Sequence, residues 1–397
     1  MDVYLDYQSA KPVDESVLKT MLPYFKQEFG NPSSLHKTGD KATTTLEDAR
    51  KKVANFINAP NPEDIIFTSG ATESNNLALI GGAMRYKRNG NHIITSEIEH
   101  ISIRNIVKYL QREGFEIDKV PVDQFGKINL EKFKRMIRDE TILISIAIAS
   151  NEIGTIQPIR EISKIAQENE ILFHTDAIAS ESSLPIDVHE VPFDMVSLSS
   201  NDIYGPKGIG ALYLKKGIRV NPVIIGGGQE KGIRSGSYNL HGIVGFGKAA
   251  EIMKKEMPSE TERLKKYRDK LIENVLETIP NSYLNGHPSE RLAHNAHFRF
   301  DYIEGESLIL DLKEVNIAAA TGSACSSKTL EPSHTLISCG LLHEEAHGSL
   351  LFTLGRYTKE SDIDAVIVKL PKIIRRLRMM SPLTPPDLIK KYNEVKE

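Results

Sequence analysis

The sequence is poor in cysteine and contains only Cys325 and Cys339 among its 397 residues. Two thiols are too few for a framework of disulfide bonds, and this scarcity favours a reducing compartment. We therefore expect a cytoplasmic protein. Cys339 lies in the apolar segment 336–340, where a packed and unreactive thiol is expected.

Long apolar runs and an excess of charge of one sign are also absent. No apolar run reaches about 18 residues, and the sequence begins Met1-Asp2-Val3-Tyr4, so we expect neither membrane spanning nor secretion. The formal net charge is −3, which argues against nucleic acid as a partner. The length suits two domains, or one large core with a smaller satellite.

Short apolar segments alternate with segments of helical periodicity through the first 250 residues or so. The apolar segments predict strands at 65–68, 92–95, 116–120, 142–149, 171–174, 195–199 and 210–214. The periodic segments predict helices at 44–57, 76–86, 101–112 and 159–168. Alternation of this kind is typical of a mainly parallel sheet wrapped by helices.

The pattern changes in the last third of the chain. Charged amphipathic helices are predicted at 260–278 and 366–378, with strands near 296–300 between them. We therefore predict a large α/β domain at 13–252 and a smaller α+β domain at 253–397, completed by residues 1–12. The polar, proline-containing end at 382–397 predicts an extended tail.

A loop of small residues surrounds Cys325, in the run Thr321-Gly322-Ser323-Ala324-Cys325-Ser326-Ser327. Such side chains contribute little to a core, so the segment is predicted to be a loop that can carry its thiol to a partner. A linker with an incidental cysteine is the alternative. Unusual residues in loops are more often functional, which favours a role for this thiol.

Polar motifs follow several of the predicted strands. Thr68-Ser69-Gly70-Ala71-Thr72 leads from a strand into a helix, where free amide groups could bind an anion, although a tight turn without ligand explains the motif equally well. His100 and Asp176 end two further strands. A lone histidine is more often structural than catalytic.

Together with Leu330-Glu331-Pro332-Ser333-His334 and Leu354-Gly355-Arg356, these motifs resemble the pyridoxal-phosphate-dependent cysteine desulfurases. In that family a cysteine on a mobile loop carries a persulfide. The resemblance spans nearly the whole chain, with the motifs in the family's order. It implies a fold-type I transferase with a seven-stranded, mainly parallel sheet and a smaller α+β domain. It also implies a homodimer with the active site at the subunit interface.

The resemblance also implies a role for each matching residue. Those that would contact the cofactor are Ala71 and Thr72 on the phosphate, His100 stacked on the pyridine ring, Asn151 on its phenolic oxygen, Asp176 on its nitrogen, and Ser199 and Asp202 around it. Ser237 ends a glycine-rich loop at 226–237 that would cross the dimer interface and contact the phosphate in the partner subunit. Pairing a carboxylate with the ring nitrogen favours the protonated ring, which is the electron sink. Asn151 and Arg356 would bind the substrate carboxylate, and Cys325 and His100 would be catalytic.

One motif departs from the family pattern. The family has histidine followed by lysine in the frame that reads Ser199-Ser200-Asn201-Asp202-Ile203-Tyr204-Gly205-Pro206-Lys207 here. Asn201 and Asp202 take those two places, and Ala179 stands where the family has glutamine. A carboxylate cannot form an imine with the cofactor's aldehyde, so the usual covalent link is excluded at position 202.

Three explanations remain open. Lys207 could replace the missing lysine, although its place beyond the Gly-Pro turn argues against this. Pyridoxal phosphate could be held without a covalent link, with Asp202 or His100 as base in a true desulfurase that acts on L-cysteine. Alternatively, desulfuration is impaired and Cys325 is retained as an iron–sulfur cluster ligand or sulfur carrier toward a scaffold protein. We favour the third, because the cysteine loop is complete while the lysine site is altered.

Two further patterns have plainer interpretations. His343-Glu344-Glu345-Ala346-His347 matches a zinc-peptidase motif, but no third ligand follows, and we expect no zinc site. The basic run at 372–378 predicts a solvated helix face, with an acidic partner as the alternative.

Overall fold

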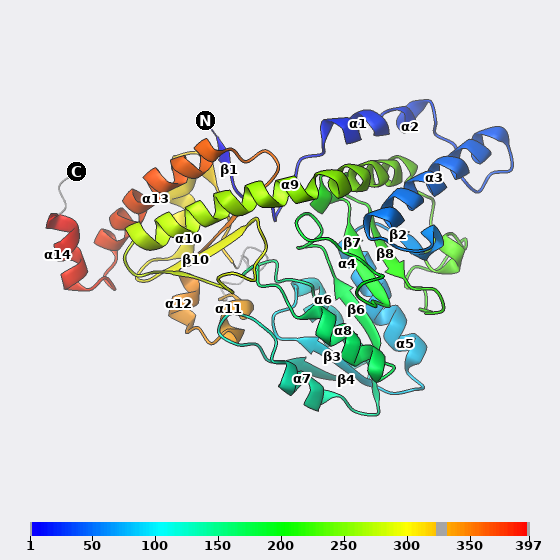
Figure 1. Ribbon diagram of the computed structural model, residues 1–397, viewed down its shortest axis with the longest axis horizontal. Coiled ribbons are helices and arrows are strands. Elements are labelled where there is room, and N and C mark those ends of the chain that lie inside the picture. Colours follow the sequence, from blue (N-terminus) through cyan, green and yellow to red (C-terminus); the bar gives the residue numbers. More distant parts are fainter. Residues whose placement is uncertain (1, 323–331, 395–397) are drawn as a thin grey trace.

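The structure is a computed structural model that describes residues 2–322 and 332–394. It contains a large domain and a smaller domain, which a long helix joins (Figure 1). The strands are β1 Val3–Tyr4, β2 Ile65–Thr68, β3 His92–Ser96, β4 Glu116–Val120, β5 Thr141–Ser145, β6 Leu172–Asp176, β7 Met195–Ser199, β8 Gly210–Leu214, β9 Ser282–Leu284, β10 Asn295–Phe300, β11 Ile317–Ala318 and β12 Ser349–Thr353.

The described helices surround these strands. They are α1 Glu15–Met21, α2 Pro23–Lys26, α3 Lys37–Phe56, α4 Ala71–Asn76, α5 Gly82–Tyr86, α6 Ile101–Arg112, α7 Leu130–Met136, α8 Ile159–Glu168, α9 Leu240–Thr278, α10 Gly305–Glu314, α11 His334–Ser338, α12 His343–His347, α13 Glu360–Met380 and α14 Pro386–Glu394. A π-helical turn, Leu77–Gly81, connects α4 to α5. None of the described helices is both long and apolar enough to cross a membrane.

The large sheet has seven strands in the order β2-β8-β7-β6-β5-β3-β4. All neighbours are parallel except β8, which is antiparallel to both β2 and β7. Successive residues of a strand point to opposite faces, and here both faces are covered: Ile65 and Phe67 pack with α3 and α9, whereas Ile66 packs with the π-helical turn and α6. The seven-stranded, mainly parallel sheet and the smaller domain confirm the predicted fold class.

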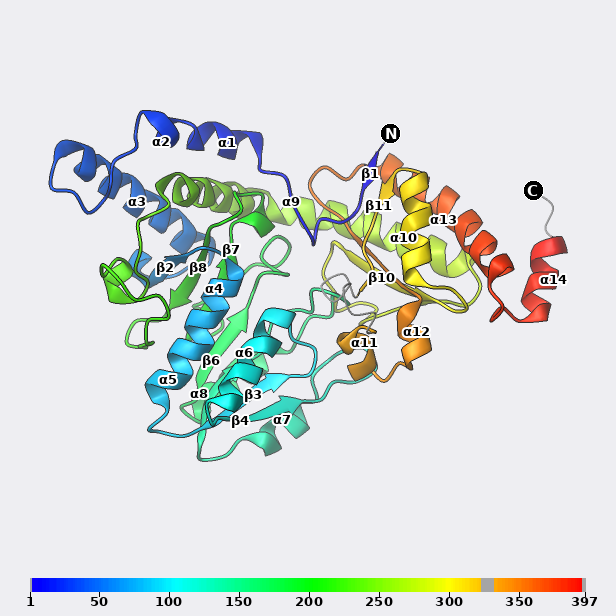
Figure 2. The same cartoon turned by 180° about the vertical axis from the view of Figure 1, so that it is seen from behind.

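The smaller domain combines two small sheets with α10 and α13. Strands β12, β10 and β9 form an antiparallel sheet, and β1 pairs in parallel with β11. The N-terminal segment therefore starts in the smaller domain and then crosses to α1 on the large domain (Figure 2). The domain boundary predicted between residues 252 and 253 lies inside α9, whose 39 residues pack against α3 at one end and α13 at the other.

The C-terminal region differs from its prediction. Residues Pro386–Glu394 form α14 rather than an extended tail, and Leu388 is buried. Arg378, predicted on a solvated face, is fully buried and donates to the carbonyls of Pro280 (2.6 Å) and Asn281 (2.9 Å). It also donates to the Tyr392 hydroxyl of α14 at 2.8 Å. The prediction of a solvated face agrees with Lys372 and Arg376, which are exposed, and is wrong for Arg378, whose hydrogen bonds also hold the last helix.

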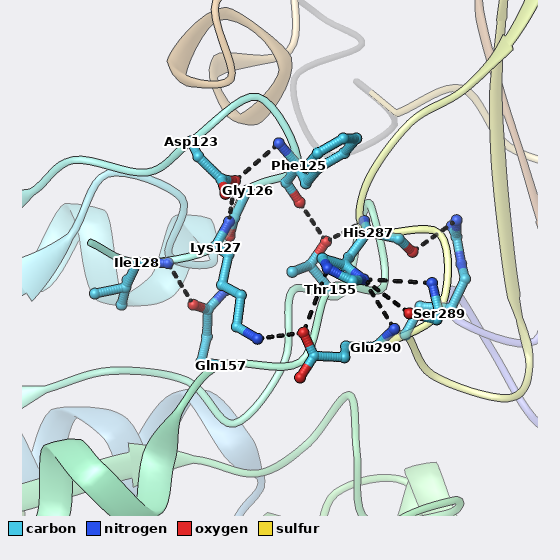
Figure 3. Close-up of polar contacts among 11 residues, drawn as sticks. Asp123, Phe125, Gly126, Lys127, Ile128, Thr155, Gln157, His287, Ser289 and Glu290 are labelled. Carbon is cyan, nitrogen blue, oxygen red and sulfur yellow. Dashed lines mark hydrogen bonds and ion pairs between the residues drawn. The ribbon is translucent and has the colours of Figure 1, made fainter. Parts of the chain in front are cut away.

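A polar network connects the loop after β4 with the segment that follows β5 and with the smaller domain (Figure 3). The Thr155 hydroxyl donates to the Phe125 carbonyl at 2.6 Å and accepts the His287 amide at 2.9 Å. The Gln157 side chain donates to the Gly126 carbonyl at 2.8 Å, and Lys127 pairs with Glu290. The segment that follows Asn151 is therefore bonded to the loop after β4 and to the smaller domain.

A buried ion pair fixes the glycine-rich loop at 226–237 to the sheet, and its removal should be costly. Arg50 of α3 lies 2.8 Å from both carboxylate oxygens of Glu230, and one of these accepts the Phe67 amide of β2. Arg50→Met leaves the Glu230 charge buried without its partner, so the free energy of unfolding in urea should fall by about 3–5 kcal/mol.

The matched control is Arg160→Met, which removes an ion pair whose side chains are each 64% exposed. That change should cost no more than about 1 kcal/mol. Equal losses for the two variants would mean that the Arg50 pair does not hold the loop.

Candidate active site

A cavity of about 270 Å³ opens where the strands of the large sheet end. Strands β3, β5, β6 and β7 are parallel, and β2 has the same direction because both β2 and β7 are antiparallel to β8. Their carboxyl ends therefore meet at one edge, the usual position of ligand sites in α/β sheets. The predicted site residues that line the cavity are Ala71, Thr72, His100, Asn151, Asp176 and Asp202.

Asp176, the last residue of β6, is a buried carboxyl group on the cavity wall. Its Oδ2 accepts the Asn75 side-chain amide at 2.8 Å, and its Oδ1 accepts the Ile178 amide at 3.0 Å. Burial raises the pKa of Asp176, while the nearby His100 acts in the opposite direction. Among the described residues no cationic side chain is hydrogen-bonded to Asp176, and such a buried carboxyl group is suited to a cationic ligand, such as a protonated pyridine nitrogen.

An anion site is formed where β2 leads into α4. Gly70 has a φ of +147°, a conformation that favours glycine, and α4 begins at Ala71. A Cβ atom on Gly210 of β8 would lie 2.7 Å from the Gly70 Cα, so glycine at 210 is required for this close approach. The first amide groups of a helix have no intrahelical partner and suit a phosphate.

His100 precedes α6 and caps it. Its Nδ1 accepts the Ser102 amide at 3.2 Å and lies 2.8 Å from the Ser102 hydroxyl. A lone histidine was predicted to have a structural role more often than a catalytic one, and His100 does have a structural role as the cap of α6. It also lines the cavity, so stacking on a bound ring stays a prediction.

Glu152 is bonded to Ser333 and lies close to Gly322, one residue on each side of the segment that contains Cys325. Its carboxyl group accepts a hydrogen bond from the Ser333 hydroxyl, and a Cβ atom on Gly322 would lie 2.4 Å from Oε1. Burial raises the pKa of Glu152 to about 7. Gly322 itself lines the cavity. Cys325, predicted as the catalytic thiol and as an iron ligand, lies outside the described residues.

The altered lysine motif forms part of the cavity wall. Asn201 and Asp202 lie in the 3₁₀ turn after β7, and both line the cavity. Asp202 is 6% exposed. Burial raises the pKa of the Asp202 carboxyl group, and Lys11 opposes this effect. Lys207, the possible replacement, is exposed and does not belong to the described lining of the cavity.

Three predicted site residues lie apart from the cavity. Ser199 is buried, and its amide donates to Glu181 at 3.1 Å. Ser237 lines a separate small hollow, as expected if it serves the cavity of a second subunit. Arg356 is bound by Asp14 at 2.8 Å and by Glu256 and Glu260. Its role toward a substrate carboxylate stays a prediction.

Two buried residues beside the site gave no sequence signal. Lys11 and Glu181 are 7% and 0% exposed, and each has an electrostatic interaction with Asp202. Neither belongs to a recognisable motif. Among the described residues, no group of three histidine, cysteine, aspartate or glutamate side chains is arranged to hold a metal ion. In the zinc-like motif, Glu345 caps α12 by accepting the Leu342 amide at 2.7 Å.

The residues present fit pyridoxal phosphate. Asp176 would hold the ring nitrogen, Ala71 and Thr72 the phosphate, His100 the ring face, and Asn151 the phenolic oxygen. The buried carboxyl group, the helix start at a strand end and the fold together define a fold-type I pyridoxal-phosphate enzyme.

The chain belongs to the class-V aminotransferase family, whose model matches residues 3–366, and within it to the IscS cysteine desulfurases. It is 57% identical over 380 residues to cysteine desulfurase IscS 1 of Archaeoglobus fulgidus, covering 96% of this chain and 99% of that protein. It is 48% identical over 385 residues to cysteine desulfurase IscS of Methanosarcina thermophila, covering 97% and 95%. A solved NifS-like protein matches with a TM-score of 0.89 and 33% identity over 95% of this chain and all of that one. The predicted family is confirmed.

Proposed function

We propose that this protein takes sulfur from L-cysteine for iron–sulfur cluster assembly, with pyridoxal phosphate held without a covalent bond to residue 202. The observation that carries the proposal is the cavity itself, where Asp176, the start of α4 and His100 face one volume. The 57% identity to a cysteine desulfurase supports the same reaction. The function favoured by the sequence, an impaired desulfurase, has less support than its active alternative.

In this proposal each residue has a defined task. Pyridoxal phosphate supplies the electron sink when it is bound. Asp176 keeps the ring nitrogen protonated, and Asp202 or His100 accepts the substrate proton. The Cys325 thiolate attacks the sulfur of the substrate. The carbon–sulfur bond breaks, a sulfur–sulfur bond forms on Cys325, and the carbon that loses sulfur gains a proton to give L-alanine.

A homodimer is part of the proposal. Ser237 lies at a hollow separate from this chain's cavity, which suits a contribution to the site of a second subunit. Analytical ultracentrifugation of the purified protein should give twice the chain mass. A scaffold protein that receives the sulfur would be a further partner.

A second candidate function is favoured by Asp202, a carboxylate on the cavity wall where the family motif has lysine. In that case desulfuration is weak, and Cys325 binds the iron of a cluster shared with the scaffold. Mixing the protein with iron, sulfide and a candidate scaffold tests this function. Loss of the cluster in Cys325→Ser would support it, and an unchanged cluster would reject it.

Reduction with borohydride tests how the cofactor is held. After incubation with pyridoxal phosphate, borohydride should leave the mass of the wild-type chain unchanged, because no lysine is joined to the cofactor. The control is Asp202→Lys, which restores an amine at the cavity wall and should gain the mass of one pyridoxyl phosphate group. A mass increase in the wild type would place the link on another lysine.

Activity is measured in the same samples. Wild-type protein with pyridoxal phosphate and L-cysteine should form alanine and sulfide in equal amounts, in the presence of a thiol reductant. Absence of alanine would reject the desulfurase proposal and leave the second candidate.

A further inference from the structure

A lysine lies buried directly behind the altered motif. Lys11 belongs to the N-terminal segment that crosses from β1 to α1 (Figure 2). Its side chain is buried and reaches residues of the large domain. Its Nζ donates to the Asp202 carbonyl at 2.6 Å and to the Ser182 hydroxyl at 3.2 Å. The Tyr204 ring centroid is 5.5 Å away. The segment contributes Asp6, Gln8 and Ser9 to the described lining of the cavity, and Lys11 is not among them.

The two atoms that accept hydrogen bonds from this ammonium group are neutral, so compensation for its charge has to come from nearby carboxyl groups. Burial lowers the pKa of Lys11. Asp202, Glu181 and Glu260 oppose this effect, in that order of strength, while Arg356 adds to it. Burying an uncompensated charge is expensive. The cluster needs at least one of the two carboxyl groups to be ionised if the ammonium group is to remain charged.

The two carboxyl groups have different surroundings. Both Glu181 oxygens accept the Ser199 amide, at 3.1 and 3.2 Å, and burial together with Asp202 raises the pKa of Glu181 well above its ordinary value. For Asp202 the largest opposing influence is Lys11, and hydrogen bonds from the Ser199 and Asn201 side chains add to it. Asp176 is the other acidic group that acts on both. One proton on Glu181 makes the group of three neutral, with Asp202 ionised.

We infer that Lys11 is a positioning residue of the cavity: bonded to the Asp202 carbonyl and the Ser182 hydroxyl, it is the counter-ion that keeps the Asp202 carboxylate ionised. The family motif has a lysine at position 202. In this chain an ammonium group lies behind that position instead, and it belongs to the N-terminal segment that starts in the smaller domain. An ionised Asp202 on the cavity wall is able to accept a proton, and this use of it rests on the proposed function. His294, buried nearby, also faces the Lys11 charge.

The test follows the protonation of Asp202 by NMR in protein without cofactor, labelled with ¹³C at the aspartate carboxyl carbon. The Asp202 signal is assigned by its loss in Asp202→Asn. In the wild type it should have the position of an ionised carboxylate at pH 7. In Lys11→Met the midpoint of its titration should rise by about 1–3 pH units, as expected for loss of a nearby opposite charge. Lys11→Arg keeps the charge and should stay much closer to the wild type.

A protonated Asp202 in the wild type at pH 7 would overturn the inference, without need of any variant. An unchanged midpoint in a folded Lys11→Met protein would do the same, with folding verified by thermal unfolding. The measurement is independent of turnover. If Asp202 titrates as expected and no alanine forms, the proposed function fails while the inference stands; alanine formation with a protonated Asp202 rejects the inference alone.

Discussion

Cys325→Ser is expected to lower the rate of alanine formation from L-cysteine by roughly 10³-fold or more. A serine hydroxyl is not ionised near neutral pH and cannot accept the sulfur as a thiolate does. The affinity for pyridoxal phosphate should stay within about twofold, because the phosphate and ring contacts proposed above involve other residues. Alanine is measured by chromatography, and affinity by titration of the cofactor's absorbance.

Cys339→Ala is the matched control for this change. Cys339 is buried, and burial raises the pKa of its thiol to about 12, so it is not a thiolate at neutral pH. Its removal should leave the rate within about twofold of the wild type. Should Cys325→Ser retain the wild-type rate, another acceptor receives the sulfur and the role proposed for this thiol is wrong.

Asp176→Asn should lower the desulfurase rate by on the order of 10²-fold and weaken the binding of pyridoxal phosphate. A neutral amide cannot hold the pyridine nitrogen in its protonated form. The amide should fit locally, because the Oδ1 atom of Asn75 is buried without a partner among the described residues. A flip of the Asn75 side chain would let this oxygen accept the new amide.

Although Asp176→Asn should lower activity and cofactor affinity, it should increase the stability of the protein without cofactor. Because burial raises the pKa of Asp176, the folded state binds its proton more tightly than the unfolded state does. The stability that this group contributes is present at low pH and is lost as the pH rises above the unfolded value. Asp176→Asn should therefore raise the melting temperature, more at pH 8 than at pH 5. A lower melting temperature at pH 8, or unchanged cofactor affinity, would contradict this account.

Local patterns in the sequence predicted the sheet well. The strand bounds expected at 65–68, 116–120, 195–199 and 210–214 agree with β2, β4, β7 and β8. For β2, β7 and β8 the reason is that a strand buried on both faces is a short run with few charged residues. The helix expected from residue 260 was too short. Helix α9 begins at Leu240 and continues through Pro258, since its packing against α3 and α13 outweighs the break that proline favours.

These local patterns do not predict contacts between residues that are far apart in the sequence. A solvated interpretation of Arg378 was reasonable for a basic run, yet the residue is buried on carbonyls about a hundred positions earlier in the chain. Nothing around Lys11 in the sequence marks it as a partner of Asp202, which is 191 positions away. The charge balance in a core depends on which ionisable groups are buried next to one another, and the spacing of apolar residues in the sequence does not reveal this.

The sequence by itself determined the family, the α/β alternation and the identity of the residues at the sheet edge, because motifs and apolar spacing are local properties of the chain. Only the tertiary structure decided that Asp176 is bonded to Asn75, that Ser237 and Arg356 lie apart from the cavity, and that an ammonium group lies behind Asp202. The reason is physical: the chemistry of this cavity depends on burial and on the distances between charges. Both arise only when segments from the two domains pack together.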